Sequence, residues 1–480
     1  MSLIIVVIFW ALYANFSKYN LDTYRDMLEN YSWGIRWQWG NSKHPPVFGW
    51  ITAAWFEIFP RTNLAYRFLS SINIGVSLAL MLLISSRYLN KNQQLATLAV
   101  ALGLPLLGFV ALDYNANSAM IPFWAASFLF YLRVLEKPNL IDGLALGLFA
   151  GLAMMVKYHS AVLLLAIFIH SIADKEVRTL WRTPAPWAAA IAFGIAVMPH
   201  ITWLFENTFS SIRFAALDQG ARDFGNIIFR QAEFFVAQFL YALPGLIILG
   251  LYRRPKDGFP LFDFAQFGVL GHTAKGRALL VVGLLPVPLT MTLALVLWVP
   301  LTSNWLAPVF IFTPILLVLL LSKTIADKRW WTGPAFILVF SVVLLALSPL
   351  IRSSILSAAR HNTVLPIIDI VRTAETLWDE EAANELAYVG GDAELSYGSS
   401  FYVKSRPYSI SGEAFESRRW INAADLESSG HMVLCFRPQC AERQQRNANF
   451  DLVREFTIPA VKGAGGPQEY KISAYLKLPK

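Results

Sequence analysis

Long apolar runs recur along this chain, and they restrict its fold more than any other feature. Four of them, at 187–205, 232–251, 278–300 and 334–350, approach the ~20 apolar residues needed to cross a hydrocarbon core of about 30 Å. Charged residues make up only 15% of the chain, compared with about 25% in soluble proteins. The sequence therefore predicts an α-helical membrane protein that crosses the bilayer many times.

We predict about eleven or more spans before residue 352. The first is the N-terminal run, which has no basic segment before it and is therefore expected to remain as a span. The spans lie near residues 2–17, 66–84, 95–112, 118–135, 141–156, 160–173, 187–205, 232–251, 278–300, 305–321 and 334–350.

The basic residues predict one orientation for these spans. With the N-terminus in the cytoplasm, the short outer connections at 113–117, 157–159 and 301–304 hold a single basic residue, Lys157. The net charge of +8 therefore reflects the positive-inside rule rather than a nucleic-acid partner. The loops predicted to be cytoplasmic hold Arg87, Lys91, Arg133, Lys137, Lys175, Arg178, Arg182, Arg253, Arg254, Lys256, Lys275, Arg277, Lys323, Lys328 and Arg329.

Three segments are predicted to lie outside the membrane. A first outer loop at 18–65, rich in Tyr and Trp, is expected to form short interfacial helices, and a second outer loop covers 206–231. Residues 352–480 turn polar and predict a soluble periplasmic α/β domain, which follows a transmembrane domain at 1–351. The pattern in this domain predicts a helix at 367–384 and strands at 386–390, 401–403 and 432–436.

The two cysteines, Cys435 and Cys440, fall in this polar segment. They are too few for a structural zinc site, which normally has four ligands. A short disulfide between them is an open alternative if the domain lies outside the cytosol.

The first outer loop carries a group of charged residues close to the first span. Asp22, Arg25 and Asp26 have i, i+3, i+4 spacing, which would place them on one helical face. An acid and a cation together suit transfer from a phosphate-linked sugar, because one group must take a proton and another must hold the departing phosphate. The alternative is a solvated helix start with local ion pairs.

Two more charged residues lie at the outer ends of spans. Asp113 follows one span and Lys157 ends another. Ionisable groups at such depth are costly and are usually paired or functional, although each could also reach the surface as an ordinary span boundary. Because they fall on the same predicted side as Asp22, we expect all three to line one outward-opening cavity.

Weaker candidates are two histidines on apolar faces, two arginines of the second outer loop, and a Trp with its Asn neighbour at the start of a span. Hydrogen-bonded core histidines, a solvated loop and an interfacial aromatic residue explain them equally well. These candidates are His159, His200, Arg213, Arg222, Asn304 and Trp305.

The sequence has no Walker loop, dinucleotide-binding glycine pattern, Ser-His-Asp signature or HExxH zinc motif. An outward-facing enzyme has no access to nucleotide sugars, so a lipid-linked donor is the physically consistent choice.

In their order along the chain, these residues resemble the GT-C superfamily of polyprenyl-phosphate-sugar transferases. That group includes the protein O-mannosyltransferases, the lipid A aminoarabinose transferase and the rhizobial lipid A galacturonosyltransferases. The resemblance covers about residues 1–350, and the C-terminal domain matches only in type and placement. It rests on Asp22 with Arg25, on His44-Pro45-Pro46, on Asp113, and on the Gly-Leu-Ala-x-x-x-Lys element from Gly151 to Lys157.

The resemblance implies the GT-C fold and an inverting glycosyltransferase of the cell inner membrane. Asp22 would accept the proton of an acceptor hydroxyl, Asp113 would orient the acceptor or the cationic groups, and polyprenyl phosphate would leave. The residues expected to bind substrate are Arg25, Asp26, Lys43, His44, Lys157, His159, Arg222 and Trp305.

The chain departs from this family at one motif. The aminoarabinose transferase has Glu-Lys before the Pro-Pro pair, where this chain has Lys43-His44. Because that acidic residue can contribute to a metal site, its loss argues against metal binding, and we predict no metal. No other cofactor is predicted.

Two other functions stay open at this stage. A transporter or flippase would also keep charges at membrane depth, but many are built from inverted repeats with broken helices, which the sequence does not display. A ligase or polymerase would use a diphosphate-linked glycan instead. The sugar also stays open, as does the acceptor, which could be a glycan, a lipid (lipid A or lipopolysaccharide) or a protein hydroxyl.

Overall fold

The computed structural model describes residues 2–22, 24–214, 223–250, 252, 265–320, 332–358, 361–410, 422–447 and 449–480. The chain forms two compact units. Unit 1 comprises Met1–Trp10, Trp39–Val47 and Ser70–Val343, and unit 2 comprises Ala11–Gln38, Phe48–Leu69 and Leu344–Lys480. Unit 2 thus joins most of the first outer loop to the C-terminal residues, and the domain boundary at 351 stays a prediction.

In the described residues as far as Ser357, the regular elements are all helices. They are α1 (Ser2–Ser17), α2 (Asp26–Gly34), α3 (Val47–Ile58), α4 (Asn63–Ser85), α5 (Lys91–Gly103), η1 (Pro105–Leu107), α6 (Ala116–Glu136), α7 (Leu140–Val156), η2 (Tyr158–Ser160), α8 (Ala161–Ala173), η3 (Val177–Arg182), α9 (Pro184–Glu206), α10 (Ser210–Arg213), α11 (Phe224–Gly250), α12 (Ala265–Gly271), α13 (Ala274–Leu284), α14 (Pro286–Val296), η5 (Ser303–Ile311), α15 (Thr313–Leu320) and α16 (Thr332–Ser357).

Several of these helices are long and apolar enough to cross a membrane. Within the described residues, five reach that length alone (α4, α6, α9, α11 and the 335–357 part of α16), and two bent pairs bring the number to seven. Shorter apolar helices include α7 and most of α1. In α9, α11 and α16 only 22% of the apolar window is buried inside the protein, so the rest is left for lipid. The prediction of a multi-pass membrane protein is confirmed.

Prolines explain where the predicted spans bend or stop. Pro286 separates α13 from α14, which meet at 41°, and Pro314 lies in the first turn of α15, which meets η5 at 59°. The span predicted at 95–112 is interrupted because α5 ends at Gly103. Leu104 is extended (ψ 119°) before Pro105, as expected when a proline ring crowds the preceding residue and removes a backbone donor.

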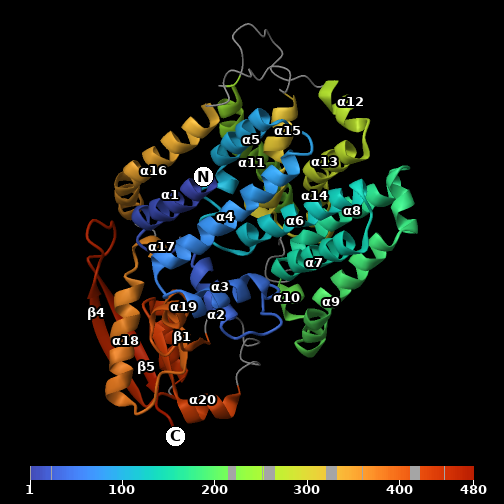
Figure 1. Cartoon of the computed structure of the whole chain (residues 1–480). Helices are drawn as coiled ribbons and strands as arrows, with labels where there is room; N and C mark the ends of the chain where they lie inside the picture. Colours follow the sequence, from blue (N-terminus) through green and yellow to red (C-terminus); the bar gives the residue numbers. More distant parts are fainter. Residues whose placement is uncertain are drawn as a thin grey trace. The chain divides into compact units, whose positions relative to one another are not determined.

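Small residues let α7 and α9 pack closely in unit 1, where the two helices lie side by side (Figure 1). A Cβ at Gly143 would lie 2.4 Å from the carbonyl oxygen of Ala185, and one at Gly147 would lie 2.0 Å from that of Ala189. Such small-residue interfaces favour close helix association in membranes. At its other end, α7 has Lys157 as its C-cap residue.

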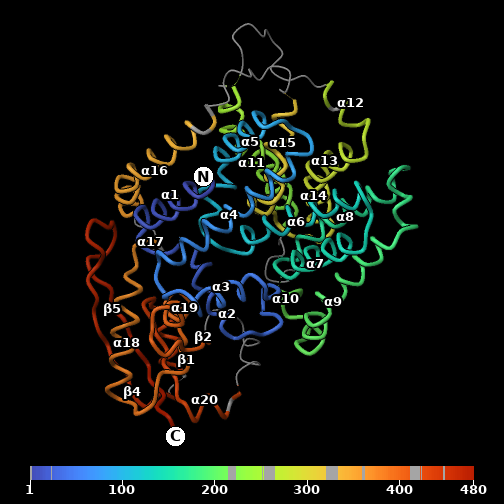
Figure 2. Tube along the Cα trace, viewed as in Figure 1, coloured from blue at the N-terminus to red at the C-terminus, as the bar shows by residue number. Residues whose placement is uncertain are grey.

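The C-terminal part of unit 2 is an α/β domain, as predicted, with a five-stranded sheet in the order β2-β1-β3-β5-β4. The β1–β2 and β1–β3 pairs are parallel, and the β3–β5 and β5–β4 pairs are antiparallel. Helix α18 runs beside the sheet and α19 lies next to α2 (Figure 2). Its elements are α17 (His361–Val364), α18 (Ile367–Glu381), β1 (Tyr388–Gly391), α19 (Ala393–Tyr402), β2 (Tyr408–Ser409), α20 (Ala423–Ser429), β3 (His431–Cys435), α21 (Pro438–Asn447), β4 (Leu452–Pro459) and β5 (Glu469–Lys477).

Three of the four elements predicted in this domain are confirmed: α18, β1 and β3 match the helix at 367–384 and the strands at 386–390 and 432–436. The strand predicted at 401–403 is wrong, because Phe401 and Tyr402 end α19. Residues 393–401 are all buried, so packing on both faces outweighs the local preference of the aromatic and β-branched residues for a strand.

Candidate functional site

Asp22 of unit 2 lies just before α2, with only 5% of its surface exposed. Its carboxylate accepts hydrogen bonds from the backbone N–H groups of Asp26 (3.1 Å) and Met27 (2.6 Å). The start of a helix favours negative charge, because its backbone N–H groups point outward. Asp22 is therefore held in one position by the helix that follows it.

The single helical face predicted for Asp22, Arg25 and Asp26 is wrong. Helix α2 begins at Asp26, and Arg25 before it adopts a left-handed conformation with φ 64°. The chain therefore turns between Asp22 and Asp26 instead of following a helix. Asp22 also lines a cavity of about 170 Å³ within unit 2.

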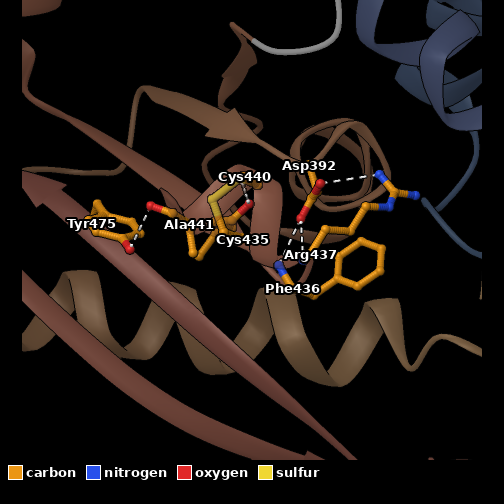
Figure 3. Close-up of a disulfide and its surroundings, with 8 residues drawn as sticks. Asp392, Cys435, Phe436, Arg437, Cys440, Ala441 and Tyr475 are labelled. Carbon is orange, nitrogen blue, oxygen red and sulfur yellow. Dashed lines mark hydrogen bonds and ion pairs between the residues drawn. A yellow bond between two sulfur atoms is a disulfide. The ribbon is translucent and has the colours of Figure 1, made fainter. Parts of the chain in front are cut away.

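Arg25 is bound by a buried carboxylate of the C-terminal domain. Its Nη1 donates to Oε1 of Glu394 at 2.9 Å, and Nη2 of Arg437 donates to the same oxygen at 2.7 Å. Glu394 is fully buried. Arg437 also donates to Asp392 at 3.1 Å, as Figure 3 shows. Glu394, Asp392 and Arg437 could not be predicted from the sequence, because Glu394 is 369 residues from Arg25 and no local motif marks it.

A glycine places this carboxylate pair. Strand β1 ends at Gly391, whose φ of 99° is unfavourable for other residues, and a Cβ there would lie 2.0 Å from the carbonyl oxygen of Leu434. Asp392 then occupies the N-cap of α19 and Glu394 its first turn, where negative charge is favoured. The carboxylate of Asp392 also accepts from the backbone N–H groups of Phe436 and Arg437.

We expect the free energy of unfolding of unit 2 to depend on pH because of Glu394. Burial alone would raise the pKa of Glu394, but the hydrogen bond from Arg437 and the charges of Arg437 and Arg25 outweigh it and lower this pKa below 4.5. A lowered carboxyl pKa stabilises the fold above the unfolded-state pKa, and this stabilisation is lost as the pH falls through the folded-state value. We expect Glu394→Gln to cost about 2 kcal/mol at pH 7, as for hydrogen bonds to a charged group.

The free energy of unfolding is measured with urea for the full chain in micelles at several pH values. Unfolding of the C-terminal domain is detected by its susceptibility to proteolysis. The difference between wild type and Glu394→Gln is expected to be constant from pH 7 to pH 5.5 and to shrink below about pH 4.5. A difference that stays constant down to pH 3 would contradict the assignment.

The cysteines form a disulfide, Cys435–Cys440, which joins the end of β3 to α21 with Cα atoms 5.4 Å apart (Figure 3). The two sulfurs and an oxygen of Asp392 lie within 4.8 Å of one another. Sulfurs bonded to each other are not thiolates, which are the form that ligates metals. This group is therefore a structural bond beside a carboxylate rather than a metal site.

Because of the disulfide, we expect both cysteines to be protected from thiol reagents in cells that carry the protein in their membrane. Without reductant, a maleimide polymer is expected to add to neither cysteine, and after reduction in denaturant it is expected to add to both. Because the closed loop is short, reduction is expected to cost about 2 kcal/mol of domain stability. Gel shifts measure the first expectation and denaturant midpoints the second. Two reactive thiols in the unreduced chain would contradict the pairing.

In unit 1, the predicted residues Lys157, His159 and Trp305 come together. Its Nζ donates to Oδ1 of Asn117 at 2.6 Å and lies 4.9 Å from the ring centroid of Trp305. His159 lies between Trp124 and Trp305, with ring centroids 6.2 and 5.9 Å apart. Asn117 and Trp124 were missed from the sequence, although Asn117 is only four residues after Asp113.

The Lys43-His44 pair lies in a loop of the same unit. The backbone N–H groups of both residues donate to Oδ1 of Asn41, at 3.0 and 2.8 Å, and Nζ of Lys43 lies 5.6 Å from the ring centroid of Phe214. Burial and the positive charges of Lys157 and Lys43 hold the pKa of His44 well below its usual value. This environment favours the neutral form of His44, and a neutral imidazole can donate a hydrogen bond to a phosphate oxygen.

The other described candidates lie in α9, α10 and η5 and in the turn before α6. Asp113 is half-buried in the turn before α6, whose first turn contains Asn117. His200 is a buried core histidine, because its ring bonds the Tyr158 hydroxyl (2.6 Å) and the Trp39 carbonyl (2.6 Å). Arg213 is exposed in α10, Asn304 lies in η5, and Arg222 is outside the described residues.

Comparisons with known proteins agree with this fold. The family model described as dolichyl-phosphate-mannose-protein mannosyltransferase matches residues 43–203. The lipopolysaccharide core galacturonosyltransferase RgtB of Rhizobium johnstonii is 26% identical over 183 residues, which cover 36% of each chain. The lipid A galacturonosyltransferase RgtD of the same organism is 23% identical over 313 residues, covering 62% of this chain and 61% of RgtD.

The fold is shared with ArnT from Cupriavidus metallidurans. Its crystal structure with bound undecaprenyl phosphate matches 98% of this chain and 97% of ArnT, with a TM-score of 0.64 and 11% identity. The apo structure gives a TM-score of 0.60. The molecule is therefore a multi-pass membrane protein with a small C-terminal sheet domain. It has the GT-C fold that the sequence motifs predicted.

The matches to the curated relatives are partial. The chain spans between 36% and 61% of the length of the relatives named above. The activities of these relatives therefore support a proposal for this chain and do not assign one.

Proposed function

We propose that this protein transfers a sugar from a polyprenyl-phosphate donor to a glycolipid of the cell envelope, at the periplasmic face of the inner membrane. The observation that carries the proposal is the cluster around Lys157, in which Asn117 and Trp305 hold the ammonium group beside His159. Such a fixed cation suits the negative charge that develops on a leaving phosphate. ArnT, which has the same fold, binds undecaprenyl phosphate, and the galacturonosyltransferase relatives act on lipopolysaccharide core or lipid A.

The proposed reaction is a single displacement. Asp22 takes the proton of the acceptor hydroxyl as that oxygen attacks the anomeric carbon. The bond between this carbon and the phosphate oxygen breaks, the configuration inverts, and polyprenyl monophosphate leaves with the bonding electrons. Lys157 and Lys43 stabilise the added negative charge, and neutral His44 donates a hydrogen bond. Asp113 orients the acceptor or the cations.

The burial of Asp22 supports its role as base. A carboxylate fixed by two backbone N–H groups needs little reorganisation when the hydroxyl arrives, and preorganised groups of this kind are effective in catalysis. Nη1 of Arg25 donates to Glu394. We therefore propose that Arg25 contacts the donor phosphate through its other N–H groups.

The Cys435–Cys440 bond supports an oxidising compartment for the C-terminal domain. Disulfides persist in the periplasm and are rare in the cytosol. We therefore keep the proposed orientation, with the C-terminal domain periplasmic.

The test is a turnover assay with the purified protein in nanodiscs, a synthetic polyprenyl-phosphate sugar and lipopolysaccharide. Release of polyprenyl monophosphate together with a glycosylated acceptor is the expected result. Release of polyprenyl diphosphate from a diphosphate-linked donor would support a ligase or polymerase. In sealed proteoliposomes, movement of the donor across the bilayer with no glycosylated product would support a flippase and would exclude the proposal.

A further inference from the structure

The turn before α2 has an unfavourable backbone conformation. Arg25, the N-cap residue of this helix, has φ 64° and ψ 7°. Residues other than glycine rarely adopt this left-handed conformation, because their Cβ then crowds a carbonyl oxygen. Strained backbone of this kind persists only where surrounding contacts hold it, and it is concentrated at functional sites. Contacts of the Arg25 side chain are therefore needed to hold this turn.

The conformation of Arg25 decides which groups bind Asp22. The φ angle of Arg25 sets the direction in which the preceding chain, which carries Asp22, meets α2. In the left-handed conformation, the carboxylate of Asp22 accepts from the backbone N–H groups of Asp26 (3.1 Å) and Met27 (2.6 Å). With Arg25 in the right-handed region, the preceding chain would leave the helix in another direction and Asp22 would lose both donors. The turn therefore helps to fix the carboxylate that is proposed as the base.

The side chain of Arg25 is anchored in the C-terminal part of unit 2. Its Nη1 donates at 2.9 Å to Oε1 of Glu394, a fully buried side chain, and Nη2 of Arg437 donates to the same oxygen at 2.7 Å. Arg437 is fixed in turn, because its Nη1 and its backbone N–H donate to Asp392 at 3.1 and 2.9 Å (Figure 3). The disulfide closes the short loop that carries Arg437. A chain of ion pairs thus runs from this closed loop to Arg25.

Helix α19, which carries Glu394 in its first turn, also packs along α2. The rings of Phe401 and Tyr31 meet edge to face with their centroids 5.1 Å apart. The Ser400 hydroxyl donates to Oγ of Ser32 at 3.2 Å. One helix of the C-terminal domain therefore holds both the body of α2 and the residue at its start.

We propose that Glu394 and Arg437 are positioning residues for sugar transfer. By holding the guanidinium of Arg25, they maintain the left-handed turn that places Asp22 against the first N–H groups of α2. They act through Arg25 and do not touch the reacting atoms. The inference rests on the proposed function, because it takes Asp22 as the base. It makes the C-terminal domain a requirement for the geometry of the base.

The test compares glycine with alanine at position 25, in the full-length protein in nanodiscs. Arg25→Gly and Arg25→Ala both remove the guanidinium, but only glycine adopts a positive φ without strain. At saturating donor and acceptor, we expect kcat of Arg25→Gly to exceed that of Arg25→Ala by about 5–30-fold, as the cost of left-handed backbone implies. Glu394→Gln is expected to lower kcat of the wild type about fivefold or more. In the Arg25→Gly background it is expected to have no further effect, because no anchored side chain remains.

Glu381→Gln is the matched control. Its carboxylate pairs with Arg454 in the same domain, and the substitution is expected to keep wild-type kcat. If Glu394→Gln does not fold, Arg437→Gln replaces it in the comparison, because this arginine is partly exposed. Equal kcat values for Arg25→Gly and Arg25→Ala would overturn the positioning role. An equal loss from Glu394→Gln in both backgrounds would do the same, since a residue that only stabilises the fold would act alike in both.

Amide hydrogen exchange separates this inference from the proposed function, because it needs no turnover. In Glu394→Gln, the N–H groups of Asp26 and Met27 are expected to exchange about fivefold faster or more than in wild type, as for a turn that opens locally. Glu381→Gln is expected to leave their exchange unchanged. Equal exchange in Glu394→Gln and wild type would overturn the positioning role even when wild type transfers sugar. Faster exchange in Glu394→Gln, together with a wild type that transfers no sugar, would sink the proposed function and leave the link from Glu394 to Asp22 in place.

Discussion

Asp22→Asn is expected to lower the rate of sugar transfer by about 10²–10⁴-fold, the usual cost of losing a general base. The asparagine side chain has nearly the same shape and can still accept a hydrogen bond from the backbone N–H of Met27. It cannot take up the acceptor proton, so the loss should appear in kcat more than in KM. Single-turnover kinetics with a radiolabelled polyprenyl-phosphate sugar measure the step directly.

Two further variants separate catalysis from folding. Asp425→Asn makes the same substitution at an exposed position of α20 in unit 2 and is expected to keep wild-type turnover. Asp22→Ala in the presence of formate is expected to recover part of the lost rate, because a free carboxylate can then act as the base. Near-normal turnover of Asp22→Asn, with an unchanged thermal midpoint, would remove Asp22 from this role.

The sequence alone predicts a multi-pass membrane protein and the order of the candidate site residues along the chain. The apolar runs predict helices because backbone N–H and C=O groups inside a membrane must form hydrogen bonds within the protein, and a helix provides them. The clustering of Lys157, His159 and Trp305 was also accessible, since all three lie at predicted outer ends of spans. Whether Asp22 and Asp113 share one cavity with Lys157 stays a prediction.

The interactions that hold these groups depend on contacts between distant residues and could not be predicted. Arg25 binds Glu394 across 369 residues, and the left-handed backbone at Arg25 breaks the helical spacing that the sequence suggested. The Ser-rich helix α19 is stable because it is buried on both faces. The lowered pKa of His44 comes first from its burial and then from the charge of Lys157, which lies more than a hundred residues away in the sequence.

Lys157→Met is expected to lower kcat by about 10²–10³-fold, the cost of removing one preorganised group from a developing negative charge. Methionine keeps much of the length and the apolar character of the lysine stem, so packing beside Trp305 is retained while the charge is lost. The effect should fall mainly on kcat, because the departing phosphate carries more negative charge in the transition state than in the bound donor. Initial rates at saturating donor measure it.

Graded variants show whether charge or shape is responsible. Lys157→Arg keeps the charge but replaces a compact ammonium by a planar guanidinium, so it is expected to recover part of the rate and to remain below wild type. Asn117→Ala removes the acceptor at 2.6 Å from Nζ and is expected to lower kcat less than Lys157→Met does, because the charge stays in place. Lys175→Met, at an exposed lysine in a loop predicted to be cytoplasmic, serves as control with wild-type rates expected. If Lys157→Met and Lys157→Arg lower kcat equally, the shape of the lysine side chain is what matters at this position. The electrostatic role assigned to Lys157 would then be wrong.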